Sequence, residues 1–293
     1  MNIQKAIDIY LNWKKAHTNV AYDRYQVRLN QFRDYIGAKT DIKNVTGDSI
    51  INFHNGMENE YSLGTIAYSA RILKNFFEFW KGRDPLLLNP KEIIPIRYTP
   101  SQTQVVSQED FEDMNLALDE RNFGDLEKKL VINLLWDTGM RISELADMKL
   151  SDISPVNEKG LRTAQVRTRK TMRYNLVVWG SKTNELLTKY LGMRLDMDAL
   201  ENNLLVNPKT YKRYTIRTYQ RWIKEISLMA QIDGNISCHG FRHGKGHHIL
   251  NTGGNVRDVQ ALLRHVKPES SFNYLQLNAS QYLKVAEKYL MTA

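Results

Sequence analysis

The spacing of apolar residues predicts a helical first part of the chain. Between residues 1 and 93, apolar side chains recur at i, i+3 and i+4, which places them on one face of a helix. These positions are Ile3, Ala6, Ile7, Tyr10 and Leu11 in the first segment and Tyr22, Tyr25, Leu29 and Phe32 in the second. Ser62 is expected to cap a further helix that ends at Gly82. We therefore expect four or five short helices in this part and no strand.

A proline-rich stretch separates this part from the rest. Residues 89–104 (NPKEIIPIRYTPSQTQ) hold three of the seven prolines and have no helical period, which indicates an extended segment. Ser107 then begins another helix, and Asp110 is the acidic partner of a capping box. The expected division is a helical N-terminal domain (1–93), a linker (94–106) and a second domain (107–293).

The second domain is expected to combine helices with one β-hairpin. Val166 and Thr168 are two positions apart, which is the period of a strand. Tyr174, Leu176 and Val178 repeat the same period further along the chain. Helical spacing is found on both sides of this hairpin. The predicted helices are 107–119, 124–138, 141–148, 183–193, 215–229, 240–251, 255–264, 268–277 and 279–290. The predicted fold is thus mainly α, with a small antiparallel β-sheet.

Composition excludes several classes of protein. Hydrophobic residues make up 42% of the 293 residues and charged residues 25%, which are ordinary values for a globular protein. No apolar run approaches the roughly 18 residues that a membrane-spanning helix requires, and the first residues lack the apolar core of a signal peptide. Cys238 is the only cysteine, so an intrachain disulfide is excluded. We expect a cytoplasmic protein without a membrane anchor.

The net charge of +9 favours a polyanionic partner, and its placement is more informative than its size. Residues 107–127 are strongly acidic, whereas the hairpin and residues 209–224 are basic without an intervening acid. The candidates for contact with DNA phosphates are Arg167, Arg169, Arg173, Arg213, Arg217 and Arg221. The last three recur every four residues and would share one face of a single helix. A solvated helix face is the alternative explanation for such a stripe.

Five of the seven histidines lie between His239 and His265, together with several arginines. A metal site is a weak hypothesis, because one cysteine and no carboxylate between residues 234 and 257 leave the usual zinc ligand set incomplete. A serine or cysteine hydrolase is equally weak, since no GxSxG motif occurs and Cys238 adjoins His239. We expect no metal and no other cofactor.

Arginine and histidine together suit phosphodiester chemistry. Guanidinium groups match the nonbridging oxygens of a phosphate, on which negative charge develops. An imidazole can accept or donate a proton. A covalent route without metal also needs a nucleophile such as tyrosine, and Tyr274 lies nine residues beyond His265.

These residues resemble the motifs of the tyrosine recombinases, also called the phage integrase family, with a Xer-like two-domain arrangement. Residues 137–145 (DTGMRISEL) are similar to the TGxRxxEL box, which implies Arg141 as the first catalytic arginine. Residues 165–180 (QVRTRKTMRYNLVVWG) resemble the VxGKGxKxRxVPLG hairpin and imply Lys170 as the catalytic lysine.

The remaining motifs follow in order. Residues 239–243 (HGFRH) resemble the HxLRH box and imply His239 and Arg242. Residues 262–265 (LLRH) resemble LLGH and imply His265, and the family spacing then falls on Tyr274 as nucleophile. The resemblance implies a SAM-like, core-binding N-terminal domain and an α+β catalytic domain, which would form a clamp around duplex DNA. Any one box is a moderate signal, but the ordered set is a strong one.

The resemblance also implies a mechanism. Tyr274 attacks a DNA phosphate to form a 3′-phosphotyrosyl bond and releases a 5′-hydroxyl, which later rejoins a partner strand. Arg141 and Arg242 bind the nonbridging oxygens, with a hydrogen bond from His265. Lys170 protonates the leaving 5′-oxygen and His239 assists proton transfer at the tyrosine. Glu144, one helical turn from Arg141, is expected to hold its guanidinium in place.

The chain departs from the family pattern at several positions. Arg264 stands where LLGH has glycine, and it needs either room or a DNA phosphate to meet. Arg169 and Thr171 replace both glycines of GKG, Val178 replaces a proline, and Lys245 stands where the family generally has an apolar residue. None of these changes removes a catalytic group.

The sequence therefore predicts a site-specific DNA recombinase or integrase that acts at the nucleoid without metal or ATP. The resemblance implies a tetramer on two DNA sites, in which residues 281–290 dock on a neighbouring protomer or pack within their own chain. Two alternatives remain open. A type IB topoisomerase would rejoin the same strand, and a DNA-binding regulator would keep the basic surface without cleavage.

Overall fold

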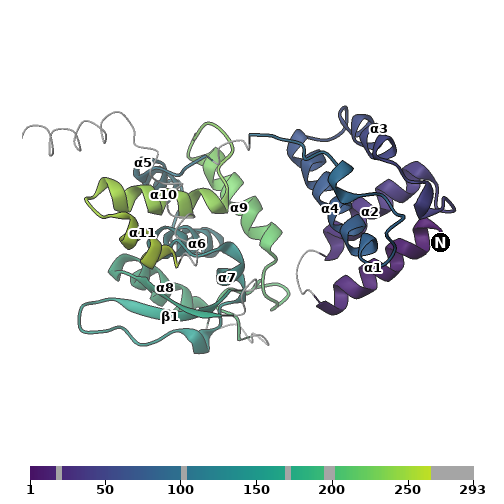
Figure 1. Cartoon of the computed structure of the whole chain (residues 1–293). Coiled ribbons are helices and arrows are strands. Elements are labelled where there is room, and N and C mark those ends of the chain that lie inside the picture. Colours follow the sequence, from purple (N-terminus) through teal and green to yellow (C-terminus); the bar gives the residue numbers. More distant parts are fainter. Residues whose placement is uncertain (18–21, 100–103, 169–172, 195–201, 265–293) are drawn as a thin grey trace, which may run out of the picture. The chain divides into compact units, whose positions relative to one another are not determined.

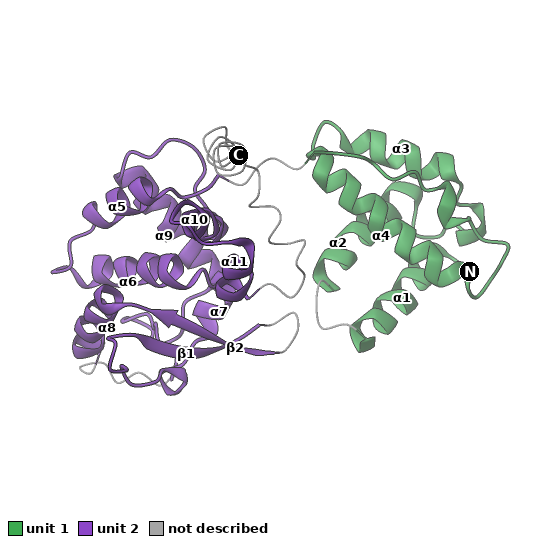
Figure 2. Ribbon diagram, turned by 60° about the vertical axis from the view of Figure 1, so that its left-hand side comes forward, with its two compact units in different colours: residues 1–102 green, residues 103–293 purple. Residues whose placement is uncertain are grey.

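Two separate hydrophobic cores divide the chain into the units Met1–Gln102 and Thr103–Ala293 (Figure 2). The computed structural model describes residues 1–17, 22–99, 104–168, 173–194 and 202–264. Each unit is considered by itself below. The mainly helical fold with one small antiparallel sheet is confirmed for the described residues.

The described elements of the first unit are helical (Figure 1), and their apolar faces meet in one core. Its described elements are α1 Ile3–His17, α2 Tyr22–Ile36, η1 Ile42–Asn44, α3 Gly47–Met57, α4 Leu63–Lys81 and η2 Pro90–Glu92. The predicted inner face of α1 is buried, as are Leu29 and Phe32 of α2. The Ser62 hydroxyl accepts from the Thr65 N–H at the start of α4, and Gly82 caps its end. The helical spacing and both boundaries of α4 are thus confirmed.

The stretch predicted as a linker gives apolar side chains to both cores. Ile93 is buried in the first core and Ile96 packs against it. Val106 is buried in the second core, and its N–H donates to the carbonyl of Gly240 at 3.2 Å. The two ends of the stretch therefore belong to different units, and residues 100–103 lie outside the described part.

The second unit is organised around one buried helix. Its described elements are α5 Gln108–Leu116, α6 Phe123–Thr138, α7 Ile142–Asp147, η3 Leu150–Asp152, β1 Arg162–Arg167, β2 Tyr174–Trp179, α8 Ser181–Arg194, α9 Ile216–Met229, α10 Cys238–Asn251 and α11 Val256–Leu263. Helix α6 lies between α8 and α10 (Figure 1) and buries residues on all its faces, as expected of a central helix. The helices predicted between 107 and 264 are confirmed, and those at 268–277 and 279–290 fall outside the described residues.

The predicted hairpin is confirmed, with strands β1 and β2 paired antiparallel from Arg162↔Trp179 to Arg167↔Tyr174. Its buried face carries Ala164 and Val166 of β1 and Val177 and Trp179 of β2. The apolar residues that revealed the β2 period, Tyr174, Leu176 and Val178, lie on the opposite, exposed face. The pairing register decides this, because it places Val177 beside the buried Ala164.

Helix α10 carries three glycines, and two of them allow an extended segment to approach it. A Cβ at Gly240 would lie 2.6 Å from the carbonyl oxygen of Gln104, and one at Gly244 would lie 2.1 Å from that of Val106. The glycines therefore serve close packing of residues 104–106 against α10. Among the described residues, no helix is both long and apolar enough to cross a membrane.

Candidate active site

The site forms where α6 ends and α7 begins. Gly139 ends α6 in the left-handed conformation (φ 55°), which glycine adopts without strain. Arg141 stands directly before α7, and the carboxylate of Glu144 accepts from its backbone N–H at 2.9 Å and from its Nη1 at 3.0 Å. The contact expected between Glu144 and Arg141 is therefore present, while 41% of the Arg141 side chain stays exposed.

Glu144 also ties the hairpin to this junction. Its side chain is fully buried, and its Oε1 accepts from the hydroxyl of Thr168 at 2.7 Å. The amide of Asn175 donates in turn to that hydroxyl at 3.0 Å. Burial alone would raise the pKa of Glu144, but the N–H of Arg141, the Thr168 hydroxyl and the nearby guanidinium groups lower it overall. Glu144 is thus ionised, and through Thr168 it is bonded to the end of β1.

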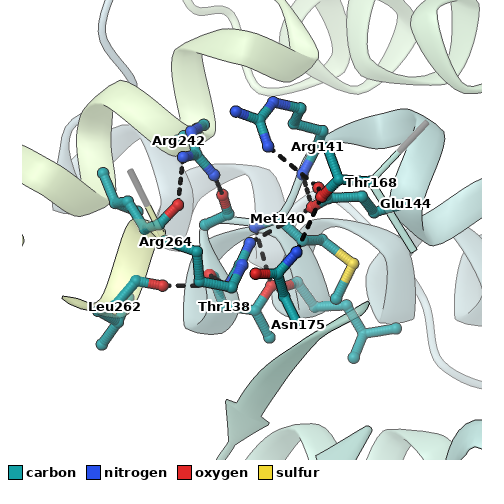
Figure 3. A network of polar contacts seen from close by, with 12 residues as sticks. Thr138, Met140, Arg141, Glu144, Thr168, Asn175, Arg242, Leu262 and Arg264 are labelled. Carbon is teal, nitrogen blue, oxygen red and sulfur yellow. Dashed lines mark hydrogen bonds and ion pairs between the residues drawn. The ribbon is translucent and has the colours of Figure 1, made fainter. Parts of the chain in front are cut away.

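Arg242 connects the ends of two helices. It lies on α10 with only 2% of its surface exposed. Its Nη1 donates to the carbonyl of Gly139 at 2.6 Å and its Nη2 donates to the carbonyl of Leu263 (Figure 3). Carbonyls at helix C-termini lack partners within the helix and carry partial negative charge, so they suit a guanidinium. Arg242 thereby fixes the end of α11 against the end of α6.

Arg264 makes a parallel connection, although the sequence pattern favours glycine there. It caps α11 in the left-handed conformation, with φ 56°. Its Nη1 donates to the carbonyls of Thr138 at 3.1 Å and Leu262 at 3.0 Å, and its Nη2 lies 3.4 Å from Glu144 Oε2 (Figure 3). The side chain is therefore accommodated within the protein.

His239 lies in the first turn of α10. Its ring packs edge-on against His243, with 4.6 Å between ring centroids. Burial, followed by the positive charges of Arg242 and Arg141, lowers the pKa of His239 below its usual value of 6.5. A lowered pKa keeps the imidazole neutral at pH 7, and a neutral imidazole can accept a proton.

His243, His248 and Cys238 are packing residues of α10. His248 lies 5.5 Å from the ring of Trp136, and burial lowers the pKa of His243 to about 4. Burial also raises the pKa of the Cys238 thiol to about 12, so it is not a reactive thiolate. Within the described ranges, no cluster of three or more histidine, cysteine or carboxylate side chains could hold a metal ion.

Several predicted site residues lie outside the described part, namely Arg169, Lys170, His265 and Tyr274. Of the six predicted catalytic residues, the structure describes Arg141, His239 and Arg242. Arg242 contacts the end of α6 at Gly139, two residues before Arg141, and His239 lies one turn from Arg242 on α10.

Of the three arginines spaced four residues apart, Arg213 lies before the helix that carries the other two, as the predicted helix 215–229 implies. Thr215 caps α9 by accepting from the Thr218 N–H at 3.2 Å, so the helix begins at Ile216 and excludes Arg213. Arg213 instead binds Asp147 at 2.7 Å. Arg217 and Arg221 lie on α9 and are exposed. Arg167 and Arg173, at the loop end of the hairpin, are exposed as well.

Sequence reasoning missed Thr168 and Asn175 as members of the Glu144 network. The only signal was positional, because both are polar residues close to the hairpin end, where Thr168 continues the buried face of β1. It also treated Arg264 as a departure to be accommodated, although the side chain contacts Glu144.

Comparisons with known proteins identify the family of this chain. Residues 104–281, more than half of the chain, match the model of the phage integrase family. The tyrosine recombinase XerC of Staphylococcus epidermidis is 25% identical over 228 residues, which cover 78% of this chain and 75% of the relative.

Solved structures show the same fold. The XerH site-specific recombinase bound to its palindromic difH substrate aligns with a TM-score of 0.78 at 17% identity, covering 97% of this chain and 84% of that one. A lambda integrase tetramer bound to a Holliday junction aligns with a TM-score of 0.76 at 14% identity, covering 94% of this chain and 77% of the other.

Proposed function

The chain belongs to the phage integrase family and is a tyrosine-type site-specific recombinase, and from this premise we propose which residues cut and rejoin the DNA. Tyr274 is the nucleophile. Its hydroxyl oxygen bonds to the phosphorus of a DNA phosphate while the bond to the 5′-oxygen breaks, which leaves a 3′-phosphotyrosyl bond and a free 5′-hydroxyl. The 5′-hydroxyl of a partner strand then attacks the phosphotyrosine and releases Tyr274.

Arg141 and Arg242 stabilise the negative charge that develops on the nonbridging oxygens, with a hydrogen bond from His265. The observation that carries this proposal is the convergence of both guanidinium groups on the end of α6, where Glu144 orients Arg141 and the carbonyl of Gly139 orients Arg242. Such fixed donors need little reorganisation during the reaction.

Two residues move protons. His239 accepts the proton of the Tyr274 hydroxyl, because its lowered pKa keeps it neutral. Lys170 donates a proton to the leaving 5′-oxygen, and Glu144 anchors the hairpin through Thr168, two residues earlier in the chain. This set of groups needs neither metal nor ATP.

The DNA backbone is bound by arginines of α9 and of the hairpin. Arg217 and Arg221 on α9, and Arg167, Arg169 and Arg173 around the hairpin, contact phosphates on either side of the cleavage point. Arg213 has a smaller part in binding than the sequence indicated, because Asp147 offsets its charge. The N-terminal unit (1–93 in the sequence prediction), joined through residues 94–106, contacts the same duplex.

Recombination joins two DNA sites, and the lambda integrase structure contains a tetramer on a Holliday junction. We infer that four copies of this chain assemble in the same way, with residues 281–290, which lie outside the described part, docking on a neighbour. Its substrate places the protein at the nucleoid in the cytoplasm.

Covalent trapping tests the reaction. Two DNA probes are used. One is a duplex that contains the inverted repeats found around a short spacer in the flanks of the gene, and the other is sheared chromosomal DNA of the source organism, from which bound sequences are recovered. The wild-type protein should retain DNA in SDS, and a nicked duplex of the recovered sequence should accumulate the adduct. Tyr274→Phe should abolish the adduct, while the control Tyr35→Phe, at an exposed tyrosine of the first unit, keeps it. An adduct that persists in Tyr274→Phe would contradict the nucleophile.

Products of the same reaction separate the alternatives. Exchange between two plasmid-borne sites is the expected result, with flanking markers recombined. Relaxation of supercoils without exchange would instead identify a topoisomerase, and sequence-specific binding with no adduct would identify a regulator.

A further inference from the structure

Arg264 is a buried cation that the established motif does not require. Only 9% of its side chain is exposed, and it contacts Thr138, Leu262 and Glu144 (Figure 3). Its Nε–H is buried and has no hydrogen-bond partner among the residues that the structure describes. Burying a guanidinium is unfavourable unless its contacts compensate, so this position needs an explanation beyond packing.

The backbone makes the choice of arginine more unusual. Arg264 has φ 56°, a conformation that favours glycine. Glycine would end α11 without strain. An arginine at this position runs against both backbone preference and burial, which points to its charge.

The contacts of Glu144 indicate what that charge does. Oε1 binds the Arg141 guanidinium and the Thr168 hydroxyl, while Oε2 binds the Arg141 N–H and Arg264. A carboxylate paired with one arginine forms a neutral pair. Paired with two arginines, it forms a triad with a net charge of +1, and the exposed member of that triad is Arg141.

We propose that Arg264 is a positioning residue of the phosphate site, which shares Glu144 with Arg141 and so leaves a net positive charge at Arg141 for the nonbridging oxygens of the scissile phosphate. Its bonds to Thr138 and Leu262 also hold the ends of α6 and α11 together beside Arg242. The inference rests on the proposed function, in that the anion it serves is the DNA phosphate.

Three variants separate charge from backbone. Arg264→Gln removes the charge, Arg264→Lys keeps it, and Arg264→Gly also removes the backbone strain. Arg257→Gln is the matched control, because Arg257 is an exposed arginine on the same helix. Arg141→Gln shows how much of the stabilisation by sulfate, measured below, arises at this site.

The first measurement needs no DNA site. The thermal midpoint is followed while sulfate, a stand-in for phosphate, replaces chloride at constant ionic strength. The wild type and Arg257→Gln should gain the same shift, and Arg141→Gln should lose part of it. Arg264→Gln and Arg264→Gly should lose that same part, and Arg264→Lys should recover most of it. A full sulfate shift in Arg264→Gln would overturn the proposal.

The second measurement is single-turnover formation of the covalent adduct at saturating DNA. Arg264→Gln should lower the rate about tenfold or more, which corresponds to the loss of one charge-assisted contact in the transition state. DNA affinity should change by less than about threefold, because most phosphate contacts are elsewhere. Arg264→Lys should restore much of the rate, which a merely structural role would not require.

The two readouts distinguish the failures. If the wild type forms no adduct with any DNA, the proposed function has failed, and the sulfate series still decides the role of Arg264. If the wild type forms the adduct and Arg264→Gly cleaves at the same rate, the proposed function stands and the role of Arg264 is refuted. If Arg264→Gln does not fold, the rate of adduct formation by Arg264→Lys decides. A rate near that of the wild type supports the proposal, and a rate as low as that of Arg264→Gly refutes it.

Discussion

Two buried glutamates of the second unit show how single residues set their own charge. Glu144 is surrounded by two arginines, a hydroxyl and an N–H, and its pKa is lowered despite burial. Glu127 is 2% exposed, and Tyr214 donates to its Oε2 at 2.8 Å. Burial raises the pKa of Glu127 to about 7, because tyrosine hydroxyls offset little of the desolvation. Both are helix residues of similar exposure, and only their partners differ.

Glu127→Gln should therefore change stability in a pH-dependent way. The protonated form is favoured in the fold, so its stabilisation is complete below the unfolded pKa near 4.5 and is lost as pH rises through about 7. The loss amounts to about 3 kcal/mol. Urea unfolding of the variant and wild type should agree at pH 4.5, and the variant should be more stable at pH 8. An identical difference at both pH values would contradict the raised pKa.

Helix α10 carries two of the proposed catalytic residues and also packs against the extended segment that precedes α5. His239 and Arg242 lie on α10, and Gly240 and Gly244 let residues 104–106 pack against the same helix. In the sequence, these glycines only weaken the helix prediction. The packing explains why they are placed one turn apart.

Gly244→Ala should destabilise the second unit. The added Cβ would lie 2.1 Å from the carbonyl oxygen of Val106, so backbone must move. Overpacking of this kind costs about 1–3 kcal/mol or more, partly offset by the better helix propensity of alanine. Gly192→Ala on α8 is the control, because a Cβ there meets nothing within 4 Å. Chemical denaturation should show a clear loss for Gly244→Ala and none for Gly192→Ala.

The elements also show how far sequence patterns reach. Helical spacing and capping residues predicted α4 and α5 because these signals are local. The condition that Arg213, Arg217 and Arg221 share a single helix is not met, because Thr215 caps α9 and leaves Arg213 before it, as the predicted helix 215–229 implies. The triad of Arg141, Glu144 and Arg264 could not be predicted as a contact, since it joins residues 120 positions apart through tertiary packing.

At the scale of the whole molecule, the two units have separate cores and separate titrating groups. The net charge of +9 gives only the sign of the partner. Among the described arginines, Arg167, Arg173, Arg217 and Arg221 are exposed, whereas Arg242 and Arg264 are buried at the proposed site. We therefore expect a titrating group buried in one core to change the stability of the unit that contains it.

His54 provides the test in the first unit. It is 7% exposed in α3, its Nε2 has no hydrogen-bond partner within the described ranges, and burial lowers its pKa to about 4. The neutral form is favoured in the fold, so this stability is present above the unfolded pKa near 6.5 and is lost as pH falls toward 4. The loss amounts to about 3 kcal/mol.

His54→Leu removes the titrating group and keeps an apolar side chain, so the first unit should become less sensitive to acid. Calorimetry of the full chain between pH 4.5 and 7 should resolve which transition responds. The transition that moves in His54→Leu should stay in place in Glu127→Gln, and the reverse should hold for the other transition, because each group belongs to a different core. If both variants moved the same transition, the two units would unfold as one, and the separation of their cores would have no energetic meaning.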